Sequence, residues 1–183
     1  MTTRTGLDAL RAAGFASLRG RRGGLVCHPA SVDSTLTHAA DLLAAGVRVA
    51  ALFGPEHGFR GTAQDLIGVA DTVAVHSLYG ATAASLKPTP AQLAGLDVLV
   101  IDLQDVGSRY YTFQATLLYC LEAAAAAGLP VVVPDRPNPL GGAIEGPTVA
   151  AGFASFVGPH PIPTRHGLTM GELARLYAAE RAP

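Results

Sequence analysis

The segment at residues 97–134 decides the fold, because it holds two strand-like runs with a helix between them. Residues 97–103 read DVLVIDL and residues 129–134 read LPVVVP, both short apolar runs rich in β-branched residues. Residues 111–127 are rich in Ala and Leu, and Gly128 follows them as a helix stop signal. A strand, a helix and a strand in this order predict two parallel strands joined by a crossover helix.

The same alternation continues toward the start of the chain. The further strands are expected at residues 24–28, 47–53 and 72–78. The third is the least regular, because His76 and Ser77 interrupt its apolar run. A helix is expected at residues 35–45, with Ser34 or Thr35 as its N-cap.

The last helix is predicted to begin at the capping box of Thr169 and Glu172. Before it, residues 136–168 are rich in Pro and Gly, and a connection of that length commonly forms a wall of a functional site. The whole pattern predicts an α/β, Rossmann-like three-layer domain with a mainly parallel sheet and helices on both faces. We expect residues 1–183 to form this single domain.

The composition and net charge of the chain give no sign of certain classes of binding partner. Of the 183 residues 49% are hydrophobic and the formal net charge is −1, so nothing points to a nucleic acid or an anionic membrane as partner. Cys27 and Cys120 have apolar neighbours and are expected in the core. The N-terminal 25 residues contain several arginines but no uninterrupted apolar run, which predicts a cytoplasmic protein, or a periplasmic or secreted one if a leader was removed.

Polar residues gather directly after the predicted strands. They are His28 after the first, residues 54–61 (GPEHGFRG) after the second, residues 102–110 (DLQDVGSRY) after the fourth and residues 135–139 (DRPNP) after the fifth. The carboxyl ends of parallel strands share one edge of a sheet, which is where ligands bind in such folds. These loops therefore predict a polar pocket for a small polyhydroxylated ligand.

Glu56 is the first candidate for a catalytic group. Pro55 and the neighbouring glycines favour a tight turn that removes water from this carboxyl, which raises its pKa toward the range of a general acid. The alternative is an ion pair with Arg60. Asp102 and Asp105 offer the second carboxylate that glycoside hydrolysis usually needs, although either of them also suits a turn-capping role.

The remaining candidates suit recognition of a ligand. The predicted binding residues are His28, His57, Arg60, Gln104, Asp105, Arg109, Tyr110, Asn138, Arg165 and His166. Arginines pair with carboxylates, either of the ligand or of the loops themselves, and Tyr110 offers a ring for stacking on a sugar. Asn138 between two prolines suits amide recognition or a turn, and the histidines suit hydroxyl recognition or structural hydrogen bonds.

The sequence contains no recognised motif for metal binding, for nucleotide binding or for an α/β-hydrolase nucleophile. The spacing of His28, His57 and His166 matches no metal-ligand motif, and no dinucleotide or nucleotide-binding glycine motif is present. A GxSxG nucleophile elbow is also missing. We therefore expect no metal and no cofactor.

Six sequence blocks resemble the NamZ-type exo-β-N-acetylmuramidases, a bacterial family formerly of unknown function. The blocks are LVCHPASVD (25–33), LFGPEHGFRG (52–61), DLQDVGSRYYTF (102–113), DRPNPLGG (135–142), EGP (145–147) and PIPTRHGLTMGELA (161–174). The resemblance implies a Rossmann-like catalytic domain that hydrolyses terminal N-acetylmuramic acid from peptidoglycan fragments, with Glu56 as the catalytic carboxyl. Because muramic acid carries a lactyl carboxylate, our hypothesis is that Arg60 or Arg109 pairs with it.

The resemblance also implies a second, C-terminal domain that this chain lacks, so the activity of the first domain by itself is an open question. Two other functions fit the same residues. One is a non-catalytic sugar-binding module derived from such an enzyme, and the other is a metal-assisted amidase that uses the histidines and carboxylates.

Overall fold

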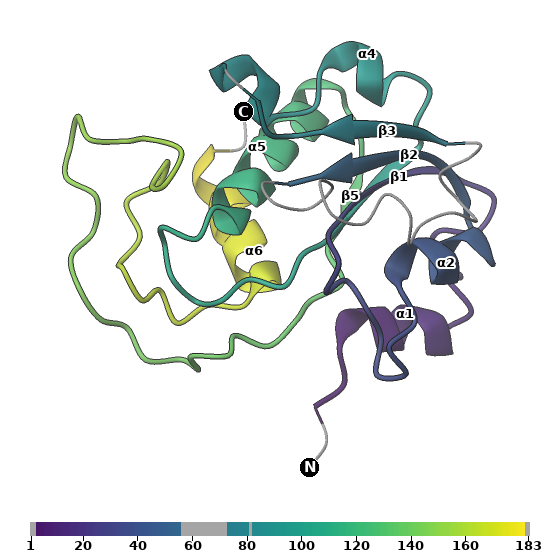
Figure 1. Ribbon diagram of the computed structural model, residues 1–183, viewed down its shortest axis with the longest axis horizontal. Helices are drawn as coiled ribbons and strands as arrows, with labels where there is room; N and C mark the ends of the chain where they lie inside the picture. Colours follow the sequence, from purple (N-terminus) through teal and green to yellow (C-terminus); the bar gives the residue numbers. More distant parts are fainter. Residues whose placement is uncertain (1–2, 56–72, 81, 182–183) are drawn as a thin grey trace.

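The protein folds around a five-stranded, all-parallel sheet in the order β3-β2-β1-β4-β5 (Figure 1). This computed structural model describes residues 3–55, 73–80 and 82–181. The strands are β1 (Arg22–Cys27), β2 (Arg48–Gly54), β3 (Ala74–Ser77), β4 (Val98–Asp102) and β5 (Val131–Val132). The predicted α/β class and all five predicted strands are confirmed, including the irregular third strand.

The helices cover both faces of the sheet, as predicted. They are α1 (Gly6–Ala12), α2 (Ala39–Ala44), η1 (Ala83–Leu86, a 3₁₀-helix), α4 (Pro90–Leu93), α5 (Phe113–Ala126) and α6 (Met170–Arg181). In Figure 1, α1 and α2 lie on one side of the sheet and α5 and α6 on the other. The sequence reasoning did not predict α1, η1 and α4.

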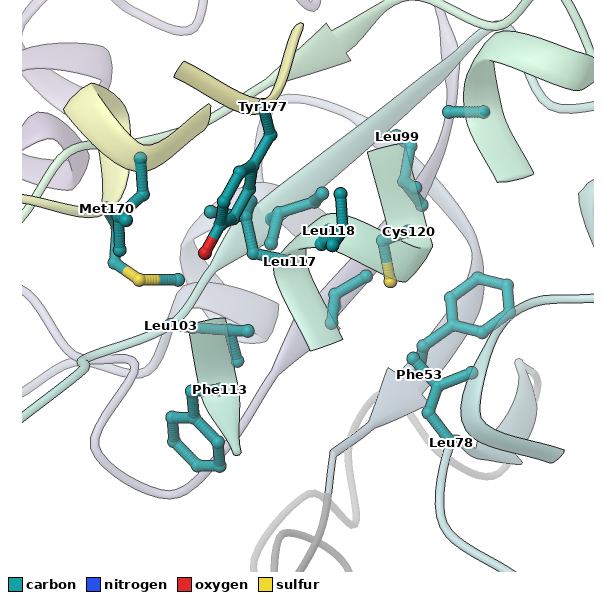
Figure 2. Packing of buried hydrophobic residues seen from close by; sticks show 14 of the residues in the cluster. Phe53, Leu78, Leu99, Leu103, Phe113, Leu117, Leu118, Cys120, Met170 and Tyr177 are labelled. Atoms are coloured by element: carbon teal, nitrogen blue, oxygen red, sulfur yellow. The ribbon is translucent and has the colours of Figure 1, made fainter. Parts of the chain in front are cut away.

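Alternating residues of the strands build two separate cores. In β4, Val98 and Val100 pack with α1 and α2, whereas Leu99 and Ile101 pack with α5 and α6. Figure 2 shows the second of these clusters, where Tyr177 of α6 lies among residues of α5 and the sheet. Every residue of β4 is buried on one face or the other, which is why the strand is apolar from Val98 to Ile101 and only Asp102 at its end is charged. Cys27 and Cys120 are buried in these cores, as expected.

The helix expected at residues 35–45 begins later than predicted, because α2 starts at Ala39 with His38 as its N-cap. The Asp33 carboxylate accepts hydrogen bonds from the backbone N–H groups of Thr35 and Thr37. These bonds hold a turn where the first helical turn was expected, which corrects the prediction of Ser34 or Thr35 as the cap.

Asp135, just beyond β5, ties both ends of the described chain to the sheet. Its backbone carbonyl accepts a hydrogen bond from the amide of Gly6, at 2.7 Å. Its carboxylate accepts from the Thr169 hydroxyl at 2.9 Å and from the Gly171 amide at 2.7 Å, at the start of α6. The predicted capping box of Thr169 and Glu172 is also present.

Candidate functional site

The candidate site lies where the direction of strand addition reverses. From β1 the chain adds β2 and β3 on one side and later β4 and β5 on the other, so the carboxyl ends of β1 and β4 border the switch point. Cys27 of β1 pairs in register with Asp102 of β4, and both strands end there. Ligands of open parallel sheets bind in the crevice at this position.

Asp102 and Arg136 form a buried two-point ion pair at the switch point. The guanidinium Nε and Nη2 donate to the two carboxylate oxygens at 2.6 and 2.8 Å, and Nη2 also donates to the Val32 carbonyl. Burial raises the pKa of Asp102, and the adjacent guanidinium opposes that shift. Both carboxylate oxygens of Asp102 therefore already have a strong partner.

His28 stands beside this pair, directly after β1. Its Nε2 accepts a hydrogen bond from the backbone N–H of Gln104 at 3.0 Å, and its ring meets Phe113 edge-on with centroids 4.7 Å apart. Burial, followed by the charges of Arg136 and His38, lowers the pKa of His28 to about 4. The imidazole is therefore neutral at physiological pH.

Asp105 and His166 form a second buried pair. His166 Nδ1 accepts from the Leu168 amide, so its Nε2 carries the proton that faces Asp105 Oδ2 at 3.2 Å. The amide of Gly107 donates to the same oxygen at 2.6 Å, which is the turn-capping bond considered for Asp105. Asp105 Oδ1 is buried, and no residue in the described part of the chain donates a hydrogen bond to it.

Two arginines hold the long connection at residues 136–168 in place. Arg109 Nη1 donates to the backbone carbonyls of Pro147 and Ile162 at 2.6 and 2.9 Å. Arg165 pairs with Glu145 at 3.0 Å and also donates to the Leu140 carbonyl. The expectation that some arginines hold loop carboxylates is confirmed for Arg165, whereas Arg136 holds the carboxylate of Asp102 at the end of β4.

Two amide side chains among the candidates bond mainly to the backbone. Asn138 donates to the Leu168 carbonyl at 3.0 Å and accepts from the Leu140 amide at 2.9 Å, which makes it a turn residue. Gln104 donates to the carbonyls of Asp105 and Pro137. These bonds fix the loops that border the switch point.

The two adjacent tyrosines have different environments. Tyr110 is 62% exposed and leaves its ring accessible for stacking. Tyr111 packs against Phe113 with ring centroids 4.7 Å apart, and it lies against the core.

Three candidates, Glu56, His57 and Arg60, lie outside the described residues. The structure describes the chain up to Pro55, which is buried directly after β2. Because β2 is next to β1, this point is one strand away from the switch point.

Sequence reasoning missed two polar residues that support the site. The Ser31 hydroxyl accepts from the His28 amide at 3.0 Å and donates to the Asp102 carbonyl at 2.5 Å, which links the ends of β1 and β4. His38 Nε2 lies 3.0 Å from the His28 carbonyl. Their closeness in sequence to His28 was the available signal.

Other features of the described residues do not coincide with the candidates. A pocket of about 640 Å³ lies between α5, η1 and the long connection, and its lining includes Tyr79, Tyr119 and Phe156. Within residues 3–55, 73–80 and 82–181, no three His, Cys, Asp or Glu residues gather as a metal site would require. None of the described helices has the length and apolar composition needed to cross a membrane.

Comparison with known proteins agrees with the resemblance seen in the sequence. Residues 24–183 match the family described as exo-β-N-acetylmuramidase NamZ, N-terminal. The chain is 46% identical to the peptidoglycan β-N-acetylmuramidase NamZ of Bacillus subtilis, over 96% of this chain and 44% of that protein.

Two crystal structures of DUF1343 family proteins from Bacteroides fragilis have the same fold. One has a TM-score of 0.89 at 42% identity and the other a TM-score of 0.83 at 33% identity. They match 98% and 99% of this chain, which covers 46% and 48% of theirs. The chain thus spans somewhat less than half the length of these relatives.

Proposed function

Because this chain belongs to the NamZ family and corresponds to its N-terminal part, we propose that it carries the catalytic centre of a glycosidase. The reaction is the release of terminal N-acetylmuramic acid from the non-reducing ends of peptidoglycan fragments. The observation that carries this proposal is the 46% identity to the Bacillus subtilis enzyme over nearly the whole chain. The polar switch point between β1 and β4 supports it, because small polar ligands bind at such positions.

Glu56 is the catalytic carboxyl in this proposal. It directly follows Pro55, the last described residue after β2, and the carboxyl end of β2 lies on the same sheet edge as His28 and Asp102. A glycosidase needs a carboxylic acid that protonates the leaving oxygen and a second carboxylate that acts as base or nucleophile. Glu56 is assigned the first of these roles.

The second carboxylate is chosen between Asp102 and Asp105. A base or nucleophile needs an oxygen that is not already engaged, and Arg136 occupies both oxygens of Asp102. Among the described residues, none donates to Asp105 Oδ1, while His166 and Gly107 hold Oδ2. We therefore favour Asp105 for the direct role, and Asp102 for positioning the loops through Arg136.

Muramic acid differs from glucosamine by a lactyl ether, and a cationic side chain is the natural partner for the carboxylate of this group. Arg136 and Arg165 are paired with carboxylates, whereas Arg109 contacts only backbone carbonyls among the described residues. Arg109, or Arg60, is thus the proposed partner of the lactyl group. Replacing the responsible arginine by Gln is expected to abolish the preference for muramic acid over N-acetylglucosamine substrates, and unchanged selectivity in both variants would contradict the assignment.

The other candidates recognise the rest of the sugar in this proposal. Tyr110 stacks on a pyranose face through its exposed ring, and Gln104 and His57 bind hydroxyl groups. Asn138, Arg165 and His166 act through the loops that they hold. No step requires a metal or a cofactor.

The test is the release of 4-nitrophenol from 4-nitrophenyl β-N-acetylmuramic acid by this chain. Glu56→Gln is the test variant, and Glu180→Gln is the matched control, because the Glu180 side chain is 52% exposed and this residue of α6 has no assigned role in the site. The N-acetylglucosamine analogue is run beside it as the second substrate, and the Bacillus subtilis relative is the positive control.

Turnover of the muramic substrate alone, lost in Glu56→Gln and kept in Glu180→Gln, is the expected result. Sugar binding without turnover, with Glu56→Gln changing only the affinity, would indicate a binding module instead. Turnover that a chelator abolishes would indicate a metal-assisted hydrolase.

A further inference from the structure

Contacts of both its backbone and its ring hold His28 in place. Its backbone N–H donates to Ser31 Oγ, its carbonyl lies 3.0 Å from His38 Nε2, and its ring meets Phe113 edge-on. The ring Nε2 accepts from the backbone N–H of Gln104 at 3.0 Å. The imidazole therefore has a defined orientation at the switch point between β1 and β4.

The bond from Gln104 decides which ring nitrogen carries the proton. A backbone N–H can only donate, so Nε2 of His28 has to be the unprotonated nitrogen. The proton of the neutral ring is then on Nδ1. None of the described residues accepts a hydrogen bond from Nδ1, and this nitrogen is not among the fully buried unpartnered atoms.

The surroundings keep this ring neutral. The charged and titratable groups around it are the Arg136 guanidinium, the Asp102 carboxylate that pairs with it, and His38. Because burial and the positive charge of Arg136 both disfavour an imidazolium, the pKa of His28 falls to about 4. Above pH 5 the ring is a hydrogen-bond donor without a net charge.

We propose that His28 is a tautomer-locked neutral donor whose Nδ1–H binds an uncharged oxygen of the sugar, a hydroxyl or the acetamido carbonyl, at the switch point. The identity of the ligand as a sugar rests on the proposed function, whereas the tautomer rests on the contacts of His28 itself. In this role His28 neither transfers a proton nor ligates a metal, since Nε2 is taken by the Gln104 amide.

The tautomer is measured first, by long-range ¹H–¹⁵N NMR on this chain labelled with ¹⁵N-histidine. The His28 signals are assigned by their loss in His28→Asn. We expect a protonated Nδ1, an unprotonated Nε2 and no titration between pH 5 and 8. A protonated Nε2, or titration near the ordinary histidine pKa of about 6.5, would overturn the inference whether or not the chain hydrolyses any substrate.

The ligand is tested by adding N-acetylmuramic acid, muramic acid without its acetyl group, or N-acetylglucosamine. A shift of the His28 Nδ1 signal with all three sugars indicates a hydroxyl acceptor, and a shift that requires the acetyl group indicates the acetamido carbonyl. His76 in β3 is the internal control and should not respond. If no sugar moves the His28 signal, the ligand assignment is wrong, while the hydrolysis assay still decides the proposed function separately.

Two substitutions of His28 distinguish the contribution of its hydrogen-bond donor from the contribution of the space that its ring fills. Asn places an amide N–H near the position of Nδ1, whereas Leu fills similar space without a donor. Sugar affinity is expected to fall about tenfold in His28→Leu, the loss typical of one hydrogen bond, and to fall less in His28→Asn. Equal affinity in the two variants would contradict the assigned donor.

Discussion

The Arg136 guanidinium donates two hydrogen bonds to the Asp102 carboxylate, at 2.6 and 2.8 Å. The Arg136 side chain is 4% exposed and the Asp102 side chain is 0% exposed. The pair joins the end of β4 to the segment after β5 and reaches Val32 through a third bond. Removing one of the two charged side chains by mutation leaves the other buried without an opposite charge.

Arg136→Leu is therefore expected to lower the free energy of unfolding by about 3–5 kcal/mol. Urea unfolding followed by circular dichroism measures the change. The exposed ion pair of Arg165 and Glu145 provides the control, since Glu145→Gln should cost less than about 1 kcal/mol. Equal effects at the two sites would show that the buried pair contributes no more than a surface pair.

Gly107 is expected to tolerate no side chain. Its φ is +84°, and a Cβ there would lie 2.3 Å from Asn138 Oδ1. Gly152 has the same φ with nothing within 4 Å, so it isolates the cost of the backbone conformation. Gly152→Ala should cost about 1–2 kcal/mol, and Gly107→Ala clearly more. Matching losses of stability would mean that Asn138 moves aside without cost.

Tyr177 of α6 donates to Gln114 Oε1 at 2.7 Å inside the core. Tyr177→Phe leaves that oxygen without this donor, so the free energy of unfolding should fall by about 1–3 kcal/mol. Thermal and urea unfolding of Tyr110→Phe serve as the comparison, because Tyr110 is exposed and should show almost no change. A neutral Tyr177→Phe would indicate that the site recruits another donor.

Both cysteine thiols are expected to be inert in the folded protein. Burial raises the pKa of Cys27 and of Cys120, and the nearby Asp102 charge adds to the effect at Cys27. The thiolate is the reactive form, so a chromogenic disulfide reagent should label neither residue at pH 8 until urea unfolds the chain. Rapid labelling under native conditions would contradict the burial of these residues.

The stability of the fold is expected to rise with pH between about 4 and 6.5 through His28. In that interval the unfolded His28 binds a proton, while the folded residue, with its pKa near 4, does not. Protons therefore favour the unfolded state as the pH falls, and above 6.5 the contribution is constant. Urea unfolding at several pH values gives the free energy of unfolding as a function of pH, and its rise between pH 4 and 6.5 should be smaller in His28→Asn than in the unsubstituted chain. An equal rise in the two proteins would assign the pH dependence to other groups.

Sequence patterns predicted the sheet because most of its strands have a simple apolar signature, the exception being β3, in which His76 and Ser77 interrupt the run. Parallel strands covered on both faces need continuous apolar runs, which β4 supplies from Val98 to Ile101. Short helices such as α4 lack a periodic signal of sufficient length, and they depend on their caps. The start of α2 was misplaced because Asp33 competes for the backbone N–H groups of the expected first turn.

The position of the site could be predicted, but the partners within it could not. The sequence predicted the strands and the polar residues that follow them, and the observed strand order then brings His28 and Asp102 together. The pairing of Asp102 with Arg136 joins residues 34 positions apart and depends on side-chain geometry. For Asn138 the sequence left two roles open, amide recognition or a turn, and the structure shows the turn.

Asp135 makes the two ends of the described chain mechanically dependent on each other. The amide of Gly6 and the first turn of α6 converge on this one residue, which directly precedes Arg136. A deletion in α1 or a displacement of α6 would pull on the same short segment and change the reach of Arg136 toward Asp102. The position of Arg136 at the switch point thus depends on contacts from both α1 and α6, which are far apart in the sequence.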